Sequence, residues 1–128
     1  NKFISEFAHY LAPMPQNIEL FKKLFKNGYP LYILSNFAAE SFNKLHQKNS
    51  FLNLANGMVI SGKVNMVKPE IHIYKHLLKK HQLYPQECLF IDDKKENIDA
   101  CQKAGIHGII FQNTPQLKEE LSKLNIQI

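Results

Sequence analysis

The 128-residue chain is long enough for one compact domain and too short for two hydrophobic cores of ordinary size. Hydrophobic residues make up 45% of it and charged residues 21%, which excludes the composition typical of disordered chains. All sixteen basic residues are lysines, so the net charge of +5 arises without the arginine fork that reads bases and phosphates. We therefore expect a soluble, cytoplasmic domain with no nucleic-acid partner.

Neither the hydropathy nor the cysteine content indicates a membrane or a disulfide framework. No apolar run approaches the roughly 20 residues that span a bilayer, and no charged segment followed by an apolar one opens the chain. The two cysteines, Cys88 and Cys101, fall in a predicted strand and a predicted helix. We expect no membrane partner and two buried thiols.

The hydrophobic pattern alternates between helical and strand segments, which is typical of an α/β fold with a parallel sheet. Residues 1–12 have apolar side chains at helical spacing and predict a helix that stops at Pro13. Asn17 is placed to cap a second helix, which Gly28 would end. Further helices are expected over 38–47 and 70–81, after Asp93 and at the C-terminus, and strands over 29–36, 57–61, 88–91 and 107–111.

Polar pairs follow two of these predicted strands. Ser35 and Asn36 end one strand, and Asp92 and Asp93 end another. Open parallel sheets bind ligands just beyond the carboxyl ends of their strands, so all four fall where a site belongs. Adjacent carboxylates repel one another, and a divalent cation is one way to stabilise them. The alternative is that these are ordinary loop residues.

Three further side chains have suitable chemistry for the same site. Lys68 precedes Pro69 at the start of a predicted helix and offers a positive charge to a phosphate or a carboxylate. The hydroxyl of Ser35 and the helix that follows it suit an anion. Asn97, in the first turn after the aspartates, could hydrogen-bond back to their loop. Each of these alone is more often a helix cap or a surface residue.

The order of the motifs along the chain favours a functional site over separate helix caps and surface residues. ILSN, then KPE, then FIDDKKEN, then the run ENIDACQKAGIHGIIF, resembles the haloacid dehalogenase-like hydrolase superfamily over about residues 17–111. The resemblance implies a Rossmann-like three-layer parallel sheet. It also implies that Ser35 and Lys68 are the catalytic residues that hold the transferring phosphoryl group, with Asn36 in the phosphate-side wall.

The same resemblance implies a metal site. An aspartate of the FIDD motif would bind Mg²⁺; Asp93 is the first choice, Asp92 would position it, and which of the two contacts the metal stays open. Asn97 would support their loop. The paired aspartates resemble the magnesium-dependent phosphatase branch and disfavour the metal-free dehalogenases, so we expect hydrolysis of a small phosphorylated metabolite.

One family motif is absent from the sequence. The family's nucleophile lies in a DxD segment at the end of the first, central strand, but the only aspartates here are Asp92, Asp93 and Asp99. We therefore expect residues 1–16 to be a remnant of a helical cap and its return to the core, and residues 17–128 to be a core lacking its first strand. The chain alone should be inactive and bind magnesium weakly or not at all.

Truncation explains this pattern best, ahead of a split gene or a separate chain that supplies the strand. The functional alternative is a noncatalytic phosphate-binding or protein-interaction module. A missing strand and cap would expose aromatic side chains, with Phe3, Phe7, Tyr10 and Phe21 as the candidates. The alternative is that these residues fill a local helix–helix core, or that a second copy covers them by self-association. His72 and His76 have helical i,i+4 spacing, but no third ligand lies nearby in sequence, so no zinc site is expected.

Overall fold

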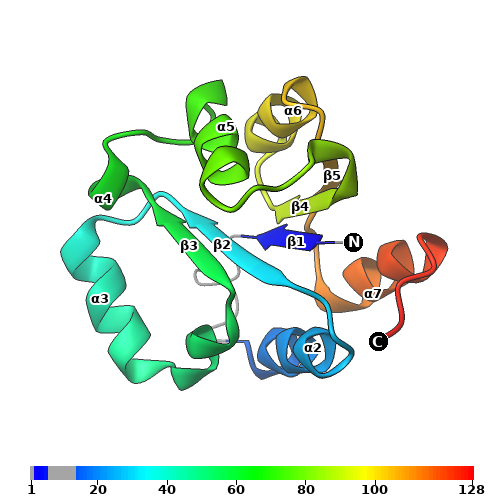
Figure 1. The fold of residues 1–128 in the computed structure, drawn as a ribbon. Helices are drawn as coiled ribbons and strands as arrows, with labels where there is room; N and C mark the ends of the chain where they lie inside the picture. Colours follow the sequence, from blue (N-terminus) through cyan, green and yellow to red (C-terminus); the bar gives the residue numbers. More distant parts are fainter. Residues whose placement is uncertain (1, 6–13) are drawn as a thin grey trace.

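A computed structural model describes residues 2–5 and 14–128, with side chains from residue 14 onward (Figure 1). The strands form one five-stranded sheet in the order β3-β2-β1-β4-β5, and every neighbouring pair is parallel. The strands are β1 Lys2–Ser5, β2 Leu31–Ser35, β3 Gly57–Ile60, β4 Cys88–Asp92 and β5 His107–Ile110. The α/β class predicted from the sequence is confirmed.

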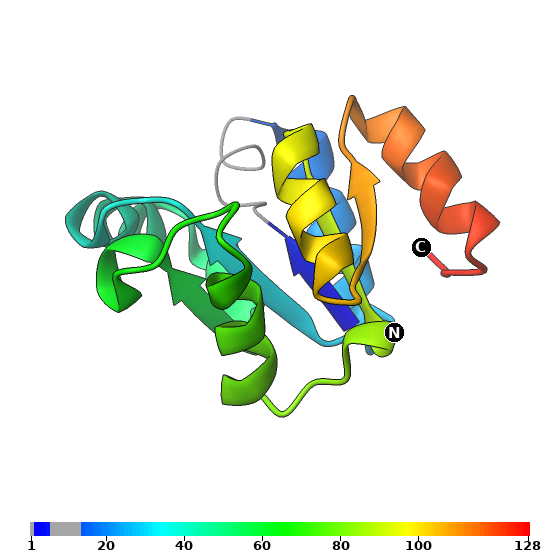
Figure 2. The ribbon, with the colours of Figure 1, turned by 90° about the horizontal axis from the view of Figure 1, so that it is seen from above.

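The helices cover both faces of the sheet. They are α2 Pro15–Lys26, α3 Ala39–Lys48, α4 Ser61–Val64, α5 Ile71–Lys80, α6 Lys95–Lys103 and α7 Thr114–Lys123, with 3₁₀ turns η1 Ser50–Leu54 and η2 Pro85–Glu87. In Figure 1, α5 and α6 lie on one side of the strands, and α2 and α7 lie on the other. Figure 2 looks onto the first side and shows α5 and α6 in front of the sheet. The result is the expected three-layer arrangement.

Two hydrophobic clusters hold these layers together. Successive side chains of a strand point to opposite faces, and a sheet covered on both sides therefore needs apolar residues in continuous runs. In β2, Leu31 and Ile33 face the cluster that contains α2 and α7, whereas Tyr32 and Leu34 face the cluster that contains α5 and α6. All five residues of β2 are buried, which is why its sequence shows no apolar-polar alternation.

The N-terminal segment differs from its sequence-based prediction. Residues 2–5 form β1, not a helix, and β1 fills the central position that was expected to be empty. Phe3 pairs with Leu31 of β2 and with Leu89 of β4, so the facing backbone groups of both strands have partners. The strand is only four residues long, KFIS, and contains no carboxylate, so the core still lacks the family's first motif. Residues 6–13, the rest of the predicted helix, lie outside the described part.

Of the four aromatic residues expected either at an exposed surface or in a helix–helix core, Phe21 lies in the core, and it is the one whose side chain is described. Phe21 is fully buried and packs edge-on against Phe51, with ring centroids 5.5 Å apart. Its position on the inner face of α2 places it in the core. The side chains of Phe3, Phe7 and Tyr10 lie outside the described part of the chain. Both cysteines are buried, as predicted. No helix in the described ranges has the length and apolar content to cross a bilayer.

His81 packs against Gly57, the first residue of the edge strand β3. Its imidazole lies directly over Gly57, because a Cβ added there would meet the His81 Cε1 atom at 2.2 Å. The ring is 5.0 Å from that of Tyr32, and its Nε2 is buried with no hydrogen-bond partner among the described residues. Burial, followed by the charges of Lys80 and His76, lowers the pKa of His81 below 6.5.

This histidine should make the fold sensitive to mild acid. The folded state disfavours the imidazolium, so its contribution to stability is complete above the unfolded pKa of 6.5 and declines as the pH falls below it. We expect urea unfolding of the native chain to show a smaller unfolding free energy at pH 5 than at pH 7, and His81→Leu to reduce that difference. An equal pH-dependent loss in both proteins would assign the acid sensitivity to other groups.

Candidate active site

The polar residues predicted from the sequence meet at one edge of the sheet. β2 ends at Ser35 and β4 ends at Asp92, on either side of β1. Ser5 at the end of β1 pairs with Ile33 and Ile91, so the three strands finish nearly level. Parallel strands place their carboxyl ends at the same edge, which brings these separate motifs together.

A buried ion pair forms the centre of this edge. The Nζ atom of Lys68 lies 2.8 Å from Oδ2 of Asp92, and neither side chain has any exposed surface. Asn97 donates a hydrogen bond of 3.1 Å to the same oxygen, and the backbone N–H of Lys94 donates one of 2.9 Å to Oδ1. Both carboxylate oxygens of Asp92 are therefore engaged within the protein, as a buried charge requires.

Asn36 fixes the backbone of Lys68. The N–H of Lys68 donates to Oδ1 of Asn36 at 2.8 Å, and Nδ2 of Asn36 donates to the carbonyl of Lys68 at 3.1 Å. These reciprocal bonds tie the segment before α5 to the end of β2, although 32 residues separate them. The ammonium also lies 5.6 Å from the centre of the Phe90 ring, in cation–π geometry. Asn36 thus positions the lysine through its main chain.

Ser35 begins the loop that leads into α3. Its side chain is fully buried, and its hydroxyl oxygen accepts a hydrogen bond of 3.3 Å from the N–H of Phe37. The first turn of α3 follows at Ala39, so the positive end of that helix's dipole lies at the same edge of the sheet. A hydroxyl together with a ten-residue helix N-terminus is a suitable environment for an anion.

The two aspartates have different environments. Asp92 is fully buried, whereas Asp93 is exposed at the start of the loop before α6. Magnesium takes one or two carboxylates together with waters and phosphate oxygens, so Asp93 suits one position of its shell while both oxygens of Asp92 are occupied. Within residues 14–128 no three acidic, histidine or cysteine side chains group together as metal ligands. The described residues therefore fit one part of a magnesium site.

Tyr74 of α5 belongs to the site, although its sequence position does not indicate this. Its hydroxyl donates to the carbonyl of Asn97 at 3.0 Å, and its ring packs edge-on against Phe90 at 5.5 Å. This buried tyrosine supports the helix turn that presents Asn97 to Asp92. The sequence places Tyr74 in the apolar stripe of a helix, and no feature of that pattern marks the hydroxyl as part of a polar network.

Cys101 of α6 is buried, and the charge of Asp92 acts on its thiol. The protein keeps this thiol neutral. Burial, and then the charges of Asp92 and Asp99, raise the pKa of the Cys101 thiol from 9.0 to about 12. Because thiolate is the reactive form, Cys101 is an inert core residue at neutral pH.

Comparison with known proteins supports the interpretation of these motifs. The family model for haloacid dehalogenase-like hydrolases matches residues 1–111. The chain is 30% identical over 114 residues to the sesquiterpene phosphatase astK of Aspergillus oryzae, covering 89% of this chain and 58% of that protein. It is 26% identical over 113 residues to flavin mononucleotide hydrolase 1 of Arabidopsis thaliana, covering 86% and 44%. The chain thus spans about half the length of these relatives.

Solved structures share the fold. An uncharacterized protein from Corynebacterium glutamicum superposes with a TM-score of 0.79 at 20% identity, over 99% of this chain and 96% of that one. A HAD family enzyme from Bacteroides thetaiotaomicron, in complex with magnesium and inorganic phosphate, gives a TM-score of 0.68 at 25% identity, over 75% and 51%. From the ordered motifs, the parallel sheet and the family match together, the chain belongs to the haloacid dehalogenase-like hydrolases.

Proposed function

We propose that the polar residues at the carboxyl ends of β2 and β4, with Lys68, provide the phosphate-binding half of a magnesium-dependent phosphatase that acts on a small phosphorylated metabolite. The observation that carries this proposal is the buried Lys68–Asp92 pair, held where β2 and β4 end. The named relatives include two phosphatases or phosphate-ester hydrolases by description, which supports the reaction class. The two relatives are named for different substrates, a sesquiterpene and flavin mononucleotide.

Lys68 and Ser35 are the proposed phosphate ligands. Asp92 holds the ammonium group of Lys68 at the sheet edge. The first turn of α3 places the positive end of its helix dipole near Ser35. Neither Lys68 nor Ser35 has an exposed side chain. A local rearrangement must therefore expose the Nζ atom of Lys68 before a phosphate can bind it. The proposed role of Asn36 is to hold Lys68 in register through its backbone.

For the metal we propose Asp93, with Asp92 as its neighbour rather than a ligand. The exposure of Asp93, and the partners that both oxygens of Asp92 have within the protein, support this division of roles. Magnesium bound there would neutralise charge on the phosphoryl oxygens. Asp93 alone is one ligand of a shell that needs several, so the affinity of this chain for magnesium should be low.

The nucleophile lies outside these 128 residues in our proposal. Family members attack phosphorus with an aspartate at the end of the first strand, and β1 here reads KFIS, without a carboxylate. No aspartate precedes Asp92 in the sequence. Without that group no covalent phosphoenzyme can form, so the chain by itself should not turn over a phosphate ester.

This leads to a direct assay. We expect the purified chain with magnesium to hydrolyse p-nitrophenyl phosphate no faster than buffer does. Lys68→Met serves as the control, because it removes the proposed phosphate ligand and reveals any contaminating phosphatase as a rate that does not change. A magnesium-dependent rate that disappears in Lys68→Met would show that the chain has a nucleophile of its own.

A noncatalytic phosphate-binding module is the second candidate, and the absence of a DxD segment favours it. The coding sequence that precedes Asn1 separates the two candidates. A strand ending in DxD within about 80–120 residues upstream, an ordinary distance within one domain, supports the phosphatase. Such a strand would have to take the central position that β1 holds between β2 and β4. A reading frame that lacks such a segment supports the module.

A further inference from the structure

Helix α5 differs in charge from the other long helices. In α2, α3, α6 and α7, a lysine lies within 4.0 Å of a carboxylate three or four residues away. The sequence of α5, IHIYKHLLKK, contains no acidic residue. Ile73, Tyr74 and Leu77 form its buried face. Its solvent side therefore carries only basic polar groups: His72, Lys75, His76, Lys79 and Lys80.

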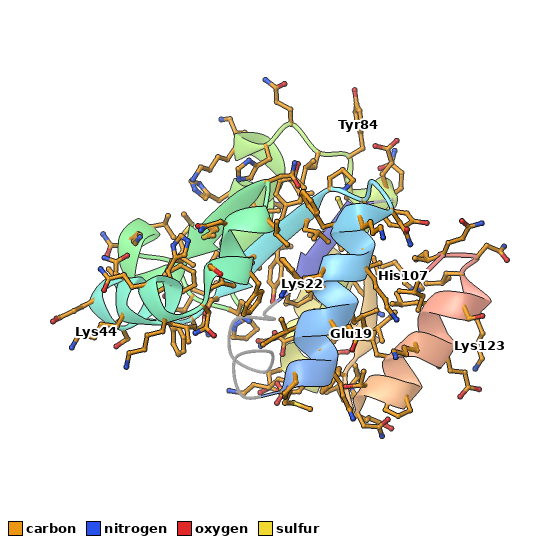
Figure 3. The ribbon with its side chains drawn as sticks, turned by 90° about the horizontal axis from the view of Figure 1, so that it is seen from below. Glu19, Lys22, Lys44, Tyr84, His107 and Lys123 are labelled. Atoms are coloured by element: carbon orange, nitrogen blue, oxygen red, sulfur yellow. The ribbon has the colours of Figure 1, made fainter. Side chains whose placement is uncertain are left out.

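An open groove of about 450 Å³ runs beside this helix. Its apolar lining includes Leu83, which is 7% exposed, and the half-buried Leu78. Lys75 and Lys79, one helical turn apart, also line the groove, as does Tyr84, which is 64% exposed. Figure 3 shows Tyr84 projecting away from the ribbon. Neither lysine has a carboxylate within ion-pair distance in the described part of the chain.

The groove is separate from the proposed active site. The helix starts just after Lys68, and its far end contacts the beginning of β3, where Lys80 Nζ lies 3.5 Å from the carbonyl of Met58. The groove residues continue from there to Tyr84, which precedes β4. They thus lie toward the amino ends of the parallel strands, whereas Ser35 and Asp92 lie at the carboxyl ends. A bound partner would leave the catalytic edge open.

We propose that this groove docks an acidic peptide segment of a partner protein. The carboxylates of the peptide would form ion pairs with Lys75 and Lys79. An aliphatic side chain of the peptide would pack between Leu78, Leu83 and Tyr84. The uncompensated positive charge complements such a segment and steers its approach. The two leucines suit an aliphatic anchor better than stacked bases. The chain has no arginine, the residue most used to read nucleic acids, so a peptide is favoured over an oligonucleotide.

A titration of the ¹⁵N-labelled chain tests this proposal. The probe is an acetylated ten-residue peptide of glutamates with two leucines four positions apart, and the matched probe has glutamine in place of every glutamate. The expected result is saturable amide shifts grouped over residues 75–84 with the acidic peptide, and at least about tenfold weaker binding by the glutamine peptide, as for the loss of charge pairs.

Two variants of the groove and one control variant on α2 locate the contact. Lys75→Glu/Lys79→Glu should weaken binding about tenfold or more. The control Lys22→Glu/Lys26→Glu makes the same charge change at the same spacing on exposed positions of α2, and should change binding by less than about threefold. Tyr84→Ala removes the exposed ring and should also weaken binding. The amide spectrum of each free variant reports whether the fold is retained.

The proposal is overturned if the glutamine peptide binds equally well, or if the two double variants weaken binding equally. It is also overturned if twelve-nucleotide oligothymidylate binds the groove more tightly than the acidic peptide. None of these readouts involves phosphate hydrolysis or magnesium. The docking site and the proposed phosphatase function can therefore fail independently.

Discussion

Lys68→Met is expected to lower the free energy of unfolding by about 3–5 kcal/mol, because it leaves the carboxylate of Asp92 buried without its counter-charge. The remaining donors to Asp92, Asn97 and the Lys94 amide, cannot replace a full positive charge. Urea unfolding at pH 7 measures this loss. It is a large part of the stability that a domain of this size ordinarily has.

The exposed pair Lys95–Asp99 provides the matched control. Its Nζ–Oδ2 distance is 3.0 Å, close to that of Lys68–Asp92, but both side chains are largely in solvent. Lys95→Met should therefore lower stability by at most about 1 kcal/mol. Adding Asp92→Asn to Lys68→Met removes the uncompensated charge and should recover part of the loss. Equal effects of Lys68→Met and Lys95→Met would show that burial of the pair has no energetic consequence.

Gly62→Ala is expected to disturb the loop that holds Asn36. A Cβ at residue 62 would lie 2.4 Å from the backbone nitrogen of Ala39 and 2.8 Å from Cα of Ala38, so the start of α3 must move. The N–H of Gly62 also donates to the carbonyl of Phe37, next to Asn36. Overpacking against backbone should cost about 1–3 kcal/mol in urea unfolding.

Gly57→Ala is a comparison that separates this effect from a general glycine effect. Its Cβ would also be too close to a neighbour, but that neighbour is the His81 side chain at the opposite end of β3, not backbone of the site loop. In amide spectra, Gly62→Ala should shift Asn36, Phe37 and Lys68 strongly, and Gly57→Ala should leave them in place. Unchanged signals for these three residues in Gly62→Ala would contradict the proposed coupling.

The sequence predicted the strands that end in the site better than it predicted β1. The runs that became β2 and β4 are apolar on both faces, only five residues long and end at polar pairs, which is typical of strands buried on both faces. The residues of β1 are four in number, and their apolar spacing with the residues that follow also suits a helix. Only pairing with Leu31 and Leu89, far away in sequence, decides their conformation. The short α4 has no hydrophobic period that could have revealed it.

Within the site, the order of the motifs identified the residues, but it did not predict that Asp92 is buried and Asp93 exposed. Asp92 and Asp93 are adjacent and chemically identical, and their difference arises from contacts across 24 residues to Lys68 and through the α6 turn to Asn97. Strand alternation turns Asp92 inward, while Asp93 starts the loop. The use of the Asn36 amide on the Lys68 backbone likewise depends on two loops meeting, which a linear pattern does not encode.

A titration of the ¹⁵N-labelled chain with inorganic phosphate in magnesium buffer tests the proposed phosphate site directly. We expect saturable shifts at the amides of Asn36, Phe37 and Lys94, and weaker binding in Asp93→Asn, whose exposed position should leave the fold intact. If phosphate leaves these amides unmoved, or shifts only residues at the opposite edge of the sheet, then Ser35, Lys68 and Asp93 do not form a phosphate site.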